Sequence, residues 1–402
     1  MSNSIQGGAS ELEIRRDLIA AAHLLVPVLE KHAQEGEQLR RLPAQAADAL
    51  RDAGFFRLAA PRVFGGHGAG VRTILEVTEE LARGDAGAAW VAMILTGGAY
   101  VTGQLGDDAR SQVWDSTPDA AIVGSLTPSG LGRPGDDGSL VIAGKWAWAS
   151  GADEADWAAL AVLVPGEDGG PEEPELVLVP AGQLAIEDTW HVAGMSATGS
   201  KTLSGEGIVV PAGRRLRLGS VLAGEYAARH PDEPFLRTAA ASFLALSVVG
   251  PMLGLARAAL DLTQGIALRK PMSLSFYPRL ADSPSVQLSL ADATSLVDTA
   301  RLHAYRAADD LDRAAADGRL LTVAERARVR MDAAVAATRS REAVDSLLSV
   351  AGAGSFALAS PLQKIWRDLG TASRHGTVNS NLVREVYGRA LLGFDEQPTF
   401  LI

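Results

Sequence analysis

Residues 144 to 164 read GKWAWASGADEADWAALAVLV. The first part alternates tryptophan with small residues, as a strand does when successive side chains point to opposite faces. The last part, DWAALAVLV, is a short apolar run typical of a buried strand. Gly151 and the acidic residues after it interrupt the pattern, as turn residues do. Two strands joined without a helix predict an antiparallel sheet or small barrel at this point of the chain.

The regions on either side of this stretch have a different texture. Short β-rich runs separated by Gly, Pro and Asp continue from residue 119 to about 215. Residues 10–118 and 230–396 show helical spacing instead, and the second region predicts a four-helix bundle. We therefore expect an α+β fold, mainly α, with a helical domain, a central β domain and a helical bundle. One stripe in the bundle repeats at spacings of three and four: Leu290, Ala293, Leu296, Ala300, Ala304, Ala307 and Leu311.

Composition restricts the class of protein. The chain has 402 residues, 47% hydrophobic and 21% charged, which is ordinary for a soluble protein. A net charge of −11 argues against nucleic acid as a partner, and the absence of cysteine excludes thiolate chemistry. The apolar run 238–262 is interrupted by Pro251, Arg257 and Asp261, so it favours a buried helix over a membrane span. Because the N-terminus lacks a signal-peptide pattern, we expect a cytoplasmic protein.

Several common catalytic motifs are missing from the sequence. GGHGAG at 65–70 resembles a dinucleotide-binding turn but has no strand before it. There is no GxxxxGK[ST], no HExxH and no GxSxG, because GMSATG at 194–199 has the wrong spacing. These absences disfavour nucleotide hydrolases, Rossmann dehydrogenases, zinc hydrolases and serine hydrolases, and we expect no metal site.

Four stretches, in order, resemble the acyl-CoA dehydrogenases. They are AAPRVFGGHGAG (59–70), GSLTPSG (124–130), the stretch quoted above, and HVAGMSATGSKTLSGEGIVVP (191–211). The resemblance covers nearly the whole chain. It implies the acyl-CoA dehydrogenase-like fold, which has an N-terminal helical domain, a central antiparallel β domain and a C-terminal four-helix bundle.

The C-terminal region divides this superfamily. Acyl-CoA dehydrogenases commonly carry Tyr-Glu-Gly-Thr here, whereas this chain has Arg374-His375-Gly376-Thr377. That change, with Trp90 in GDAGAAWVA and the ending YGRALLG, is similar to the group D flavin-dependent monooxygenases. Those proteins are the oxygenase components of two-component systems. The resemblance implies reduced FMN or FAD from a separate NAD(P)H:flavin reductase, O2 as cosubstrate, and hydroxylation of a small aromatic or polycyclic substrate through a flavin-4a-hydroperoxide.

The resemblance also implies roles for individual side chains. His375 and Ser150 would be catalytic, with His375 hydrogen-bonding the oxygen adduct or taking a proton from the substrate. Trp90 would line the substrate pocket together with His375, and Asp368 and Asn379 would orient the imidazole. The residues expected to bind the flavin are Ser125, Thr127, Trp148, Ser150, Thr198, Ser200, Arg269 and Arg279.

Two of these expectations have a geometric content. Strand alternation predicts that Trp146, Trp148 and Ser150 lie on one face. Arg269 and Arg279 would hold the flavin phosphate across a subunit interface, in a homodimer or homotetramer built through the C-terminal bundle.

Other interpretations of the sequence remain open. An N-oxygenase of an amino sugar and an FAD-dependent acyl-CoA dehydrogenase share the expected fold. A catalytically silent scaffold would bring Ser150 and His375 to no common pocket, and His375 would then only cap a helix. The sequence leaves open the substrate, the reductase, FMN against FAD, and dimer against tetramer.

Overall fold

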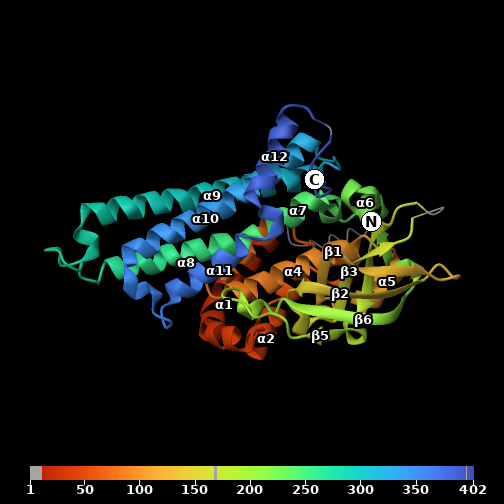
Figure 1. Cartoon of the computed structure of the whole chain (residues 1–402), viewed down its shortest axis with the longest axis horizontal. Helices are drawn as coiled ribbons and strands as arrows, with labels where there is room; N and C mark the ends of the chain where they lie inside the picture. Colours follow the sequence, from red (N-terminus) through yellow and green to blue (C-terminus); the bar gives the residue numbers. More distant parts are fainter. Residues whose placement is uncertain (1–10, 167–169, 395) are drawn as a thin grey trace, which may run out of the picture.

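The computed structural model describes residues 11–166, 170–394 and 396–402. The chain runs from helices to a sheet and back to helices (Figure 1). Residue 10, where we expected the first domain to begin, lies outside the described residues. The N-terminal helices are α1 (Glu11–Leu39), α2 (Ala44–Asp52), α3 (Val71–Ala82), α4 (Ala86–Gly103) and α5 (Asp107–Trp114).

In the part of the chain that the structure describes, seven strands form one sheet in the order β5-β6-β2-β1-β3-β4-β7. The expected fold class is confirmed, with one difference: the sheet is mixed, because β1 and β3 pair in parallel. The chain reverses direction after β1 and again after β2, so β3 runs in the same direction as β1. Because β3 pairs with β1 on the side away from β2, the two strands pair in parallel. The strands are β1 (Ile122–Pro134), β2 (Leu140–Ala149), β3 (Trp157–Val164), β4 (Glu173–Pro180), β5 (Ala185–Glu187), β6 (Lys201–Val210) and β7 (Arg215–Arg217).

The C-terminal part is helical. Its long helices lie side by side at the end of the molecule remote from the sheet (Figure 1). The expected stripe lies on α9. Leu290 and Leu296 are half-buried, and the other five positions of the stripe are buried: Ala293, Ala300, Ala304, Ala307 and Leu311. The helices are α6 (Leu218–Ala223), α7 (Ala240–Ser247), α8 (Val249–Ala267), α9 (Pro284–Ala316), α10 (Val323–Ala351), α11 (Pro361–Ala372) and α12 (Ser380–Leu391).

Two helical segments, 86–103 and 240–267, are long and apolar enough to cross a membrane. They are 89% and 83% buried inside the protein, so the same apolar composition is explained by core packing. The second segment consists of α7 and α8 and includes most of the apolar run noted in the sequence.

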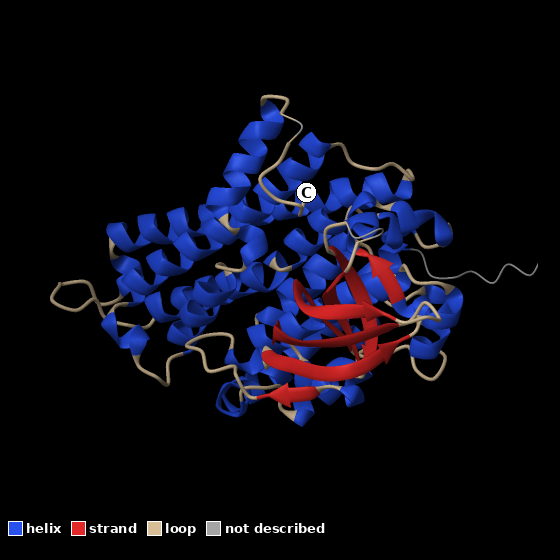
Figure 2. Ribbon diagram, turned by 45° about the vertical axis from the view of Figure 1, so that its right-hand side comes forward, coloured by secondary structure: helices blue, strands red, loops and turns tan. Residues whose placement is uncertain are grey.

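Helix α4 joins the sheet to the helical body. It packs against β1 on one side and against α3 and α8 on the other. The approach to β1 is close, because a Cβ at Gly98 would lie 2.0 Å from the carbonyl oxygen of Ile122. Figure 2 shows the sheet lying against the helical body, and α4 therefore places its side chains at the junction of the two.

Candidate active site

The site begins at irregularities in two neighbouring strands. The pairing of β1 with β3 shifts between Ser125 and Gly130, and the pairing of β2 with β6 shifts between Trp146 and Ala149. The Ser125 hydroxyl donates to the carbonyl of Ala147 across 3.5 Å, which links the two irregular segments. Such bulges redirect side chains and are common beside active sites.

The bulge in β2 overturns the expected alternation of its side chains. Trp146 is fully buried and donates its indole N–H to the carbonyl of Ala161 at 2.8 Å. Trp148 is 70% exposed and has a φ of 62°, a conformation that is strained for a bulky residue. The expectation that Trp146, Trp148 and Ser150 share a face is therefore wrong, because the extra residue shifts the period. An exposed indole beside Ser150 results.

A chain of hydrogen bonds joins four of the expected side chains to one another. The Trp90 indole N–H donates to the Ser150 hydroxyl at 3.2 Å, and the Ser150 and Ser200 hydroxyls are 2.6 Å apart. The hydroxyls of Ser200 and Thr198 are 2.7 Å apart, and Thr198 donates to the Met195 carbonyl at 2.7 Å. All five residues are buried. They come from α4, the end of β2, and the segment before β6 that includes the short helix η6 (Ser196–Thr198).

His375 joins this group through Trp90. The two rings meet edge to face, with centroids 5.7 Å apart and planes at 65°. His375 precedes the short helix η12 (Gly376–Val378), and its Nδ1 lies 2.9 Å from the Thr377 hydroxyl and accepts the Thr377 backbone N–H at 3.4 Å. The imidazole is solvent-exposed in the single chain, and the protein packed around it disfavours its charged form and so lowers the pKa of His375.

Asp368 and Asn379 do not orient His375 as we expected. Asp368 accepts the backbone N–H of Met195 at 2.5 Å, and Asn379 caps α12 by accepting the N–H of Asn381 at 3.1 Å. Thr377, which the sequence analysis did not single out, holds the imidazole instead. The capping interpretation of His375 is also correct, since its Nδ1 caps η12. Spacing alone does not reveal such contacts within a turn.

The sequence analysis also missed a buried ion cluster. Lys364 Nζ lies 2.7 Å from a carboxylate oxygen of Asp368 and 3.1 Å from one of Asp85. Burial disfavours the charge of Lys364, but the two carboxylates outweigh it and raise the pKa of Lys364 above its usual range. Asp85 also caps α4 by accepting the backbone N–H of Ala88 at 2.8 Å. The cluster therefore ties α11 to the start of α4.

The segment before β6 is held tightly against α11. A Cβ at Gly194 would lie 2.1 Å from the Arg367 carbonyl oxygen, so only glycine fits this approach. Met195 has a φ of 60°, its N–H binds Asp368, and its carbonyl accepts the Trp190 indole N–H at 3.1 Å. Met195, on whose carbonyl the chain of hydroxyls ends, is thus held by hydrogen bonds at both its N–H and its carbonyl.

Three expected residues lie apart from this group. Thr127 is exposed, in the irregular part of β1. Arg269 and Arg279 are exposed in the connection between α8 and α9, at the left end of Figure 1 and remote from the sheet. Arg279 pairs with Asp282 at 2.7 Å. Within a single chain, these arginines do not meet Ser150.

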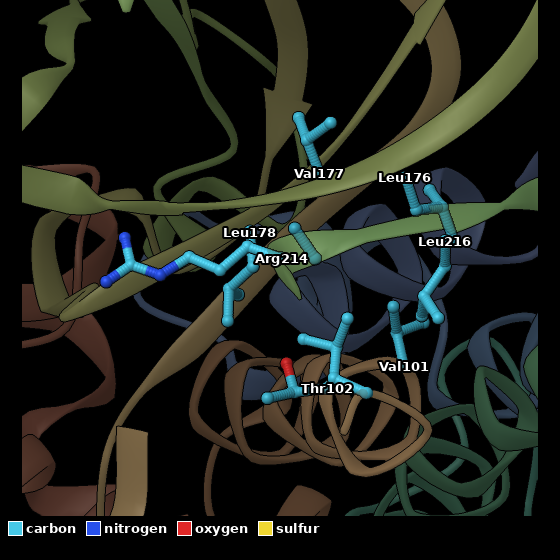
Figure 3. A pocket seen from close by; sticks show the side chains of 9 residues that line it. Val101, Thr102, Leu176, Val177, Leu178, Arg214 and Leu216 are labelled. Atoms are coloured by element: carbon cyan, nitrogen blue, oxygen red, sulfur yellow. The ribbon is translucent and has the colours of Figure 1, made fainter. Parts of the chain in front are cut away.

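A small internal cavity lies between α4 and the strands β3, β4 and β7. It holds about 10 Å³, enough for one water molecule at most. Figure 3 shows its side chains, with the guanidinium of Arg214 directed away from it. It is a packing defect in the core, separate from the group around Ser150. In the part of the chain that the structure describes, no cluster of three or more His, Asp or Glu forms a metal site.

Comparison with known proteins agrees with this geometry. The sequence matches the acyl-CoA dehydrogenase N-terminal domain over residues 18–114 and the C-terminal domain over residues 246–380. It is 32% identical to the oxygenase component of the FADH(2)-dependent resorcinol hydroxylase of Rhizobium sp. (strain MTP-10005), over 100% of this chain and 99% of that protein. The chain belongs to the group D flavin-dependent monooxygenases.

Solved structures of other proteins have the same fold. XiaF from Streptomyces sp., in complex with FADH2 and glycerol, superposes with a TM-score of 0.92 at 32% identity, covering 96% of this chain and 97% of that one. The 3-HSA hydroxylase from Rhodococcus sp. RHA1 gives 0.89 at 27% identity, with 96% and 99% covered. The chain is therefore the oxygenase component of a flavin-dependent system.

Proposed function

We propose that this monooxygenase hydroxylates a small aromatic or polycyclic substrate in the cytoplasm, using O2 and reduced flavin supplied by a separate NAD(P)H:flavin reductase. The observation that carries the proposal is the convergence of Trp90, Ser150, Ser200 and His375, which we infer to line one recess. Ser150 and His375 are 225 positions apart in the sequence and both contact Trp90, as a shared site requires. A scaffold without chemistry would not need this convergence.

The residues present fit a flavin. An isoalloxazine has flat apolar faces and a polar edge, and the exposed Trp148 indole, two residues before Ser150, offers a flat apolar surface. The strained φ of Trp148 is understandable at a ligand site, where such conformations concentrate. Ser125, whose hydroxyl contacts the Ala147 carbonyl, would lie near the same ring. When bound, reduced flavin would supply the electrons that activate O2, and one atom of that O2 enters the substrate while the other leaves as water.

His375 acts in this proposal as a hydrogen-bond donor. The Thr377 N–H points at Nδ1, and the Thr377 hydroxyl, 2.9 Å from the same nitrogen, can donate to it as well, so we assign the proton of the neutral ring to Nε2. We find no partner for Nε2 among the described residues, so this N–H is available to an oxygen atom in the recess. Of the two roles that the resemblance implied, this tautomer favours hydrogen bonding to the reacting oxygen over removal of a substrate proton.

The apolar character of the core cluster that contains Trp90 favours a ring substrate over a sugar. Ile94, Leu126 and Leu244 are half-buried apolar residues that pack against the same core cluster as Trp90. The ion cluster around Lys364 has its charges paired with one another. Relatives named for resorcinol and, at 24% identity, for p-hydroxyphenylacetate hydroxylation support an aromatic substrate. N-oxygenation of an amino sugar remains the second candidate.

Arg269 and Arg279 enter the proposal through a second copy of the chain. Their connection carries the fully exposed side chains of Leu274 and Phe276, an apolar surface that is costly in water. We propose that a homodimer or homotetramer covers this surface and brings the arginines to the flavin phosphate of a neighbouring copy.

One experiment tests the function directly. The purified protein is mixed under anaerobic conditions with photoreduced FMN or FAD and resorcinol, and ¹⁸O2 is then admitted. The expected product is a hydroxylated resorcinol that carries one ¹⁸O atom, detected by mass spectrometry, and its yield falls in Ser150→Ala and His375→Ala. Stoichiometric FAD in the purified protein together with oxidation of an acyl-CoA would overturn the proposal in favour of a dehydrogenase.

A further inference from the structure

We propose that Ser200 and Thr198 set the direction of the Ser150 hydroxyl, so that the site discriminates in favour of reduced flavin over oxidised flavin. The inference rests on the proposed function, since it assumes that Ser150 meets the flavin ring. It goes further because it assigns a task to two residues that stand behind Ser150 and explains a binding preference by hydrogen-bond direction.

The two ends of the hydroxyl chain have only one possible role each. At one end, the Trp90 indole nitrogen can only donate, and it lies 3.2 Å from Ser150 Oγ. At the other end, the Met195 carbonyl can only accept, and it lies 2.7 Å from Thr198 Oγ1. A chain of single-proton hydroxyls between a donor and an acceptor has one satisfying arrangement.

The direction follows one residue at a time. Thr198 gives its only hydroxyl proton to Met195, so at 2.7 Å from Ser200 it must accept from that residue. Ser200 has then used its proton, so at 2.6 Å from Ser150 it must accept as well. The reverse order would leave the oxygens of Thr198 and Met195 2.7 Å apart with no proton between them, which is repulsive.

The donors of Ser150 are therefore both committed. Its hydroxyl proton goes to Ser200, and its backbone N–H goes to the Trp148 carbonyl at 3.0 Å. One lone pair of Ser150 Oγ takes the Trp90 N–H. One lone pair is left without a partner among the described residues, so Ser150 presents an acceptor to a ligand.

The Met195 carbonyl, which anchors the chain of hydroxyls, is held in its orientation by the hydrogen bonds of its neighbours. The Met195 N–H binds Asp368 at 2.5 Å, and its carbonyl also accepts the Trp190 indole N–H at 3.1 Å. The Thr198 carbonyl in turn accepts the Gly151 N–H at 2.8 Å, which ties the turn after Ser150 to the same segment. Reversal of the hydroxyls would need this whole segment to move.

The two redox states of flavin differ at nitrogen N5, the ring atom that we place against Ser150. Nitrogen N5 of the ring carries a hydrogen in reduced flavin and is a bare acceptor in oxidised flavin. An acceptor at Ser150 pairs with the first and opposes the second. A buried polar group left without a partner typically costs enough to change an equilibrium constant about tenfold, so we expect Ser150 to favour reduced flavin by about that factor.

The test measures the dissociation constants of oxidised and of photoreduced FMN under anaerobic conditions, and compares their ratio among variants. In Ser200→Ala and in Thr198→Val the Ser150 proton is freed to point at the ligand. The ratio Kd(oxidised)/Kd(reduced) should then fall about tenfold, and the midpoint potential of bound flavin should fall by about 30 mV. Thr202→Val, two residues after Ser200, is the matched control, because it breaks a 2.8 Å hydroxyl pair with Thr189 that lies outside the chain of hydroxyls.

The outcomes separate the two proposals. A ratio within twofold of the wild type in both Ser200→Ala and Thr198→Val, with reduced FMN still bound, would overturn the directional inference alone. A wild-type protein that binds neither redox state would overturn the proposed function. A purely structural role would weaken both affinities equally and leave the ratio unchanged, and Ser200→Thr, which keeps the hydroxyl, should restore the ratio. Circular dichroism and the Tm of each variant check that it folds.

Discussion

Two regions hold Met195, and they use different chemistry. On its amide side lies the ion cluster of Asp85, Lys364 and Asp368, which is largely buried. On its carbonyl side lies the chain of hydroxyls that leads through Thr198 to Ser150. Removing one member of a buried ion cluster is strongly destabilising, because the remaining charges stay buried without it. A single hydroxyl hydrogen bond contributes little to stability, but a chain of them fixes which oxygen donates and which accepts. The comparison separates what keeps the site in place from what makes it selective.

The largest expected effect comes from removing the cation of the cluster. Lys364→Met leaves the buried carboxylates of Asp85 and Asp368 without a cation, so the free energy of unfolding should fall by about 3–5 kcal/mol. Urea unfolding measures it. The control is Lys145→Met, which breaks a surface pair with Glu187 at 2.8 Å and should change stability by less than about 1 kcal/mol. Equal effects in the two variants would show that the cluster does not support the segment.

A smaller effect is expected at the donor end of the hydroxyl chain. Trp90→Phe removes the indole N–H from Ser150 and part of the contact with His375, and should lower the free energy of unfolding by about 1–2 kcal/mol. Because the Met195 end alone dictates the direction, the ratio of the two flavin dissociation constants should stay within about twofold of the wild type. A fall in Kd(oxidised)/Kd(reduced) as large as in Ser200→Ala would mean that Trp90 sets the direction of the Ser150 hydroxyl.

The pH dependence of His375 gives a third, more modest effect. Burial lowers its pKa in the folded protein, so between that pKa and the usual value the unfolded chain binds more protons. The stability contribution is therefore complete above the usual histidine pKa and is lost as pH falls through the folded pKa. An NMR titration of the imidazole should have its midpoint below 6.5. His375→Asn should remove this part of the pH dependence, and a midpoint above that value would contradict the recess.

The smallest effect on the stability of the single chain is expected far from both regions. Arg269→Gln and Arg279→Gln alter exposed side chains and should change the free energy of unfolding by less than about 0.5 kcal/mol. If a second copy brings them to the flavin, the affinity for reduced FMN should nevertheless fall in both variants. Unchanged affinity, measured together with the oligomeric state by light scattering, would remove these arginines from the site.

Much of the site was predictable because its residues lie in recognisable local patterns. The hydroxyls of Ser150, Thr198 and Ser200 follow or precede strands in stretches that resemble a known family, and the structure brings them together. Trp148 was predicted on the wrong face, because a bulge inserts a residue without any local signal. Lys364 was missed because one of its partners, Asp85, lies 279 positions away in the sequence. The other partner, Asp368, is only four positions away on the same helix, and such a pair is common on a helix surface.

The sequence by itself determined the order of helices and strands and the chemical types present at the site. It could do so because hydrophobic period and turn composition are local properties of the chain. Only the tertiary structure decided that Trp90, Ser150, Ser200 and Thr198 form one directed chain ending on Met195. The direction of a hydroxyl depends on which donors and acceptors surround it, and here those partners come from segments that meet only after folding.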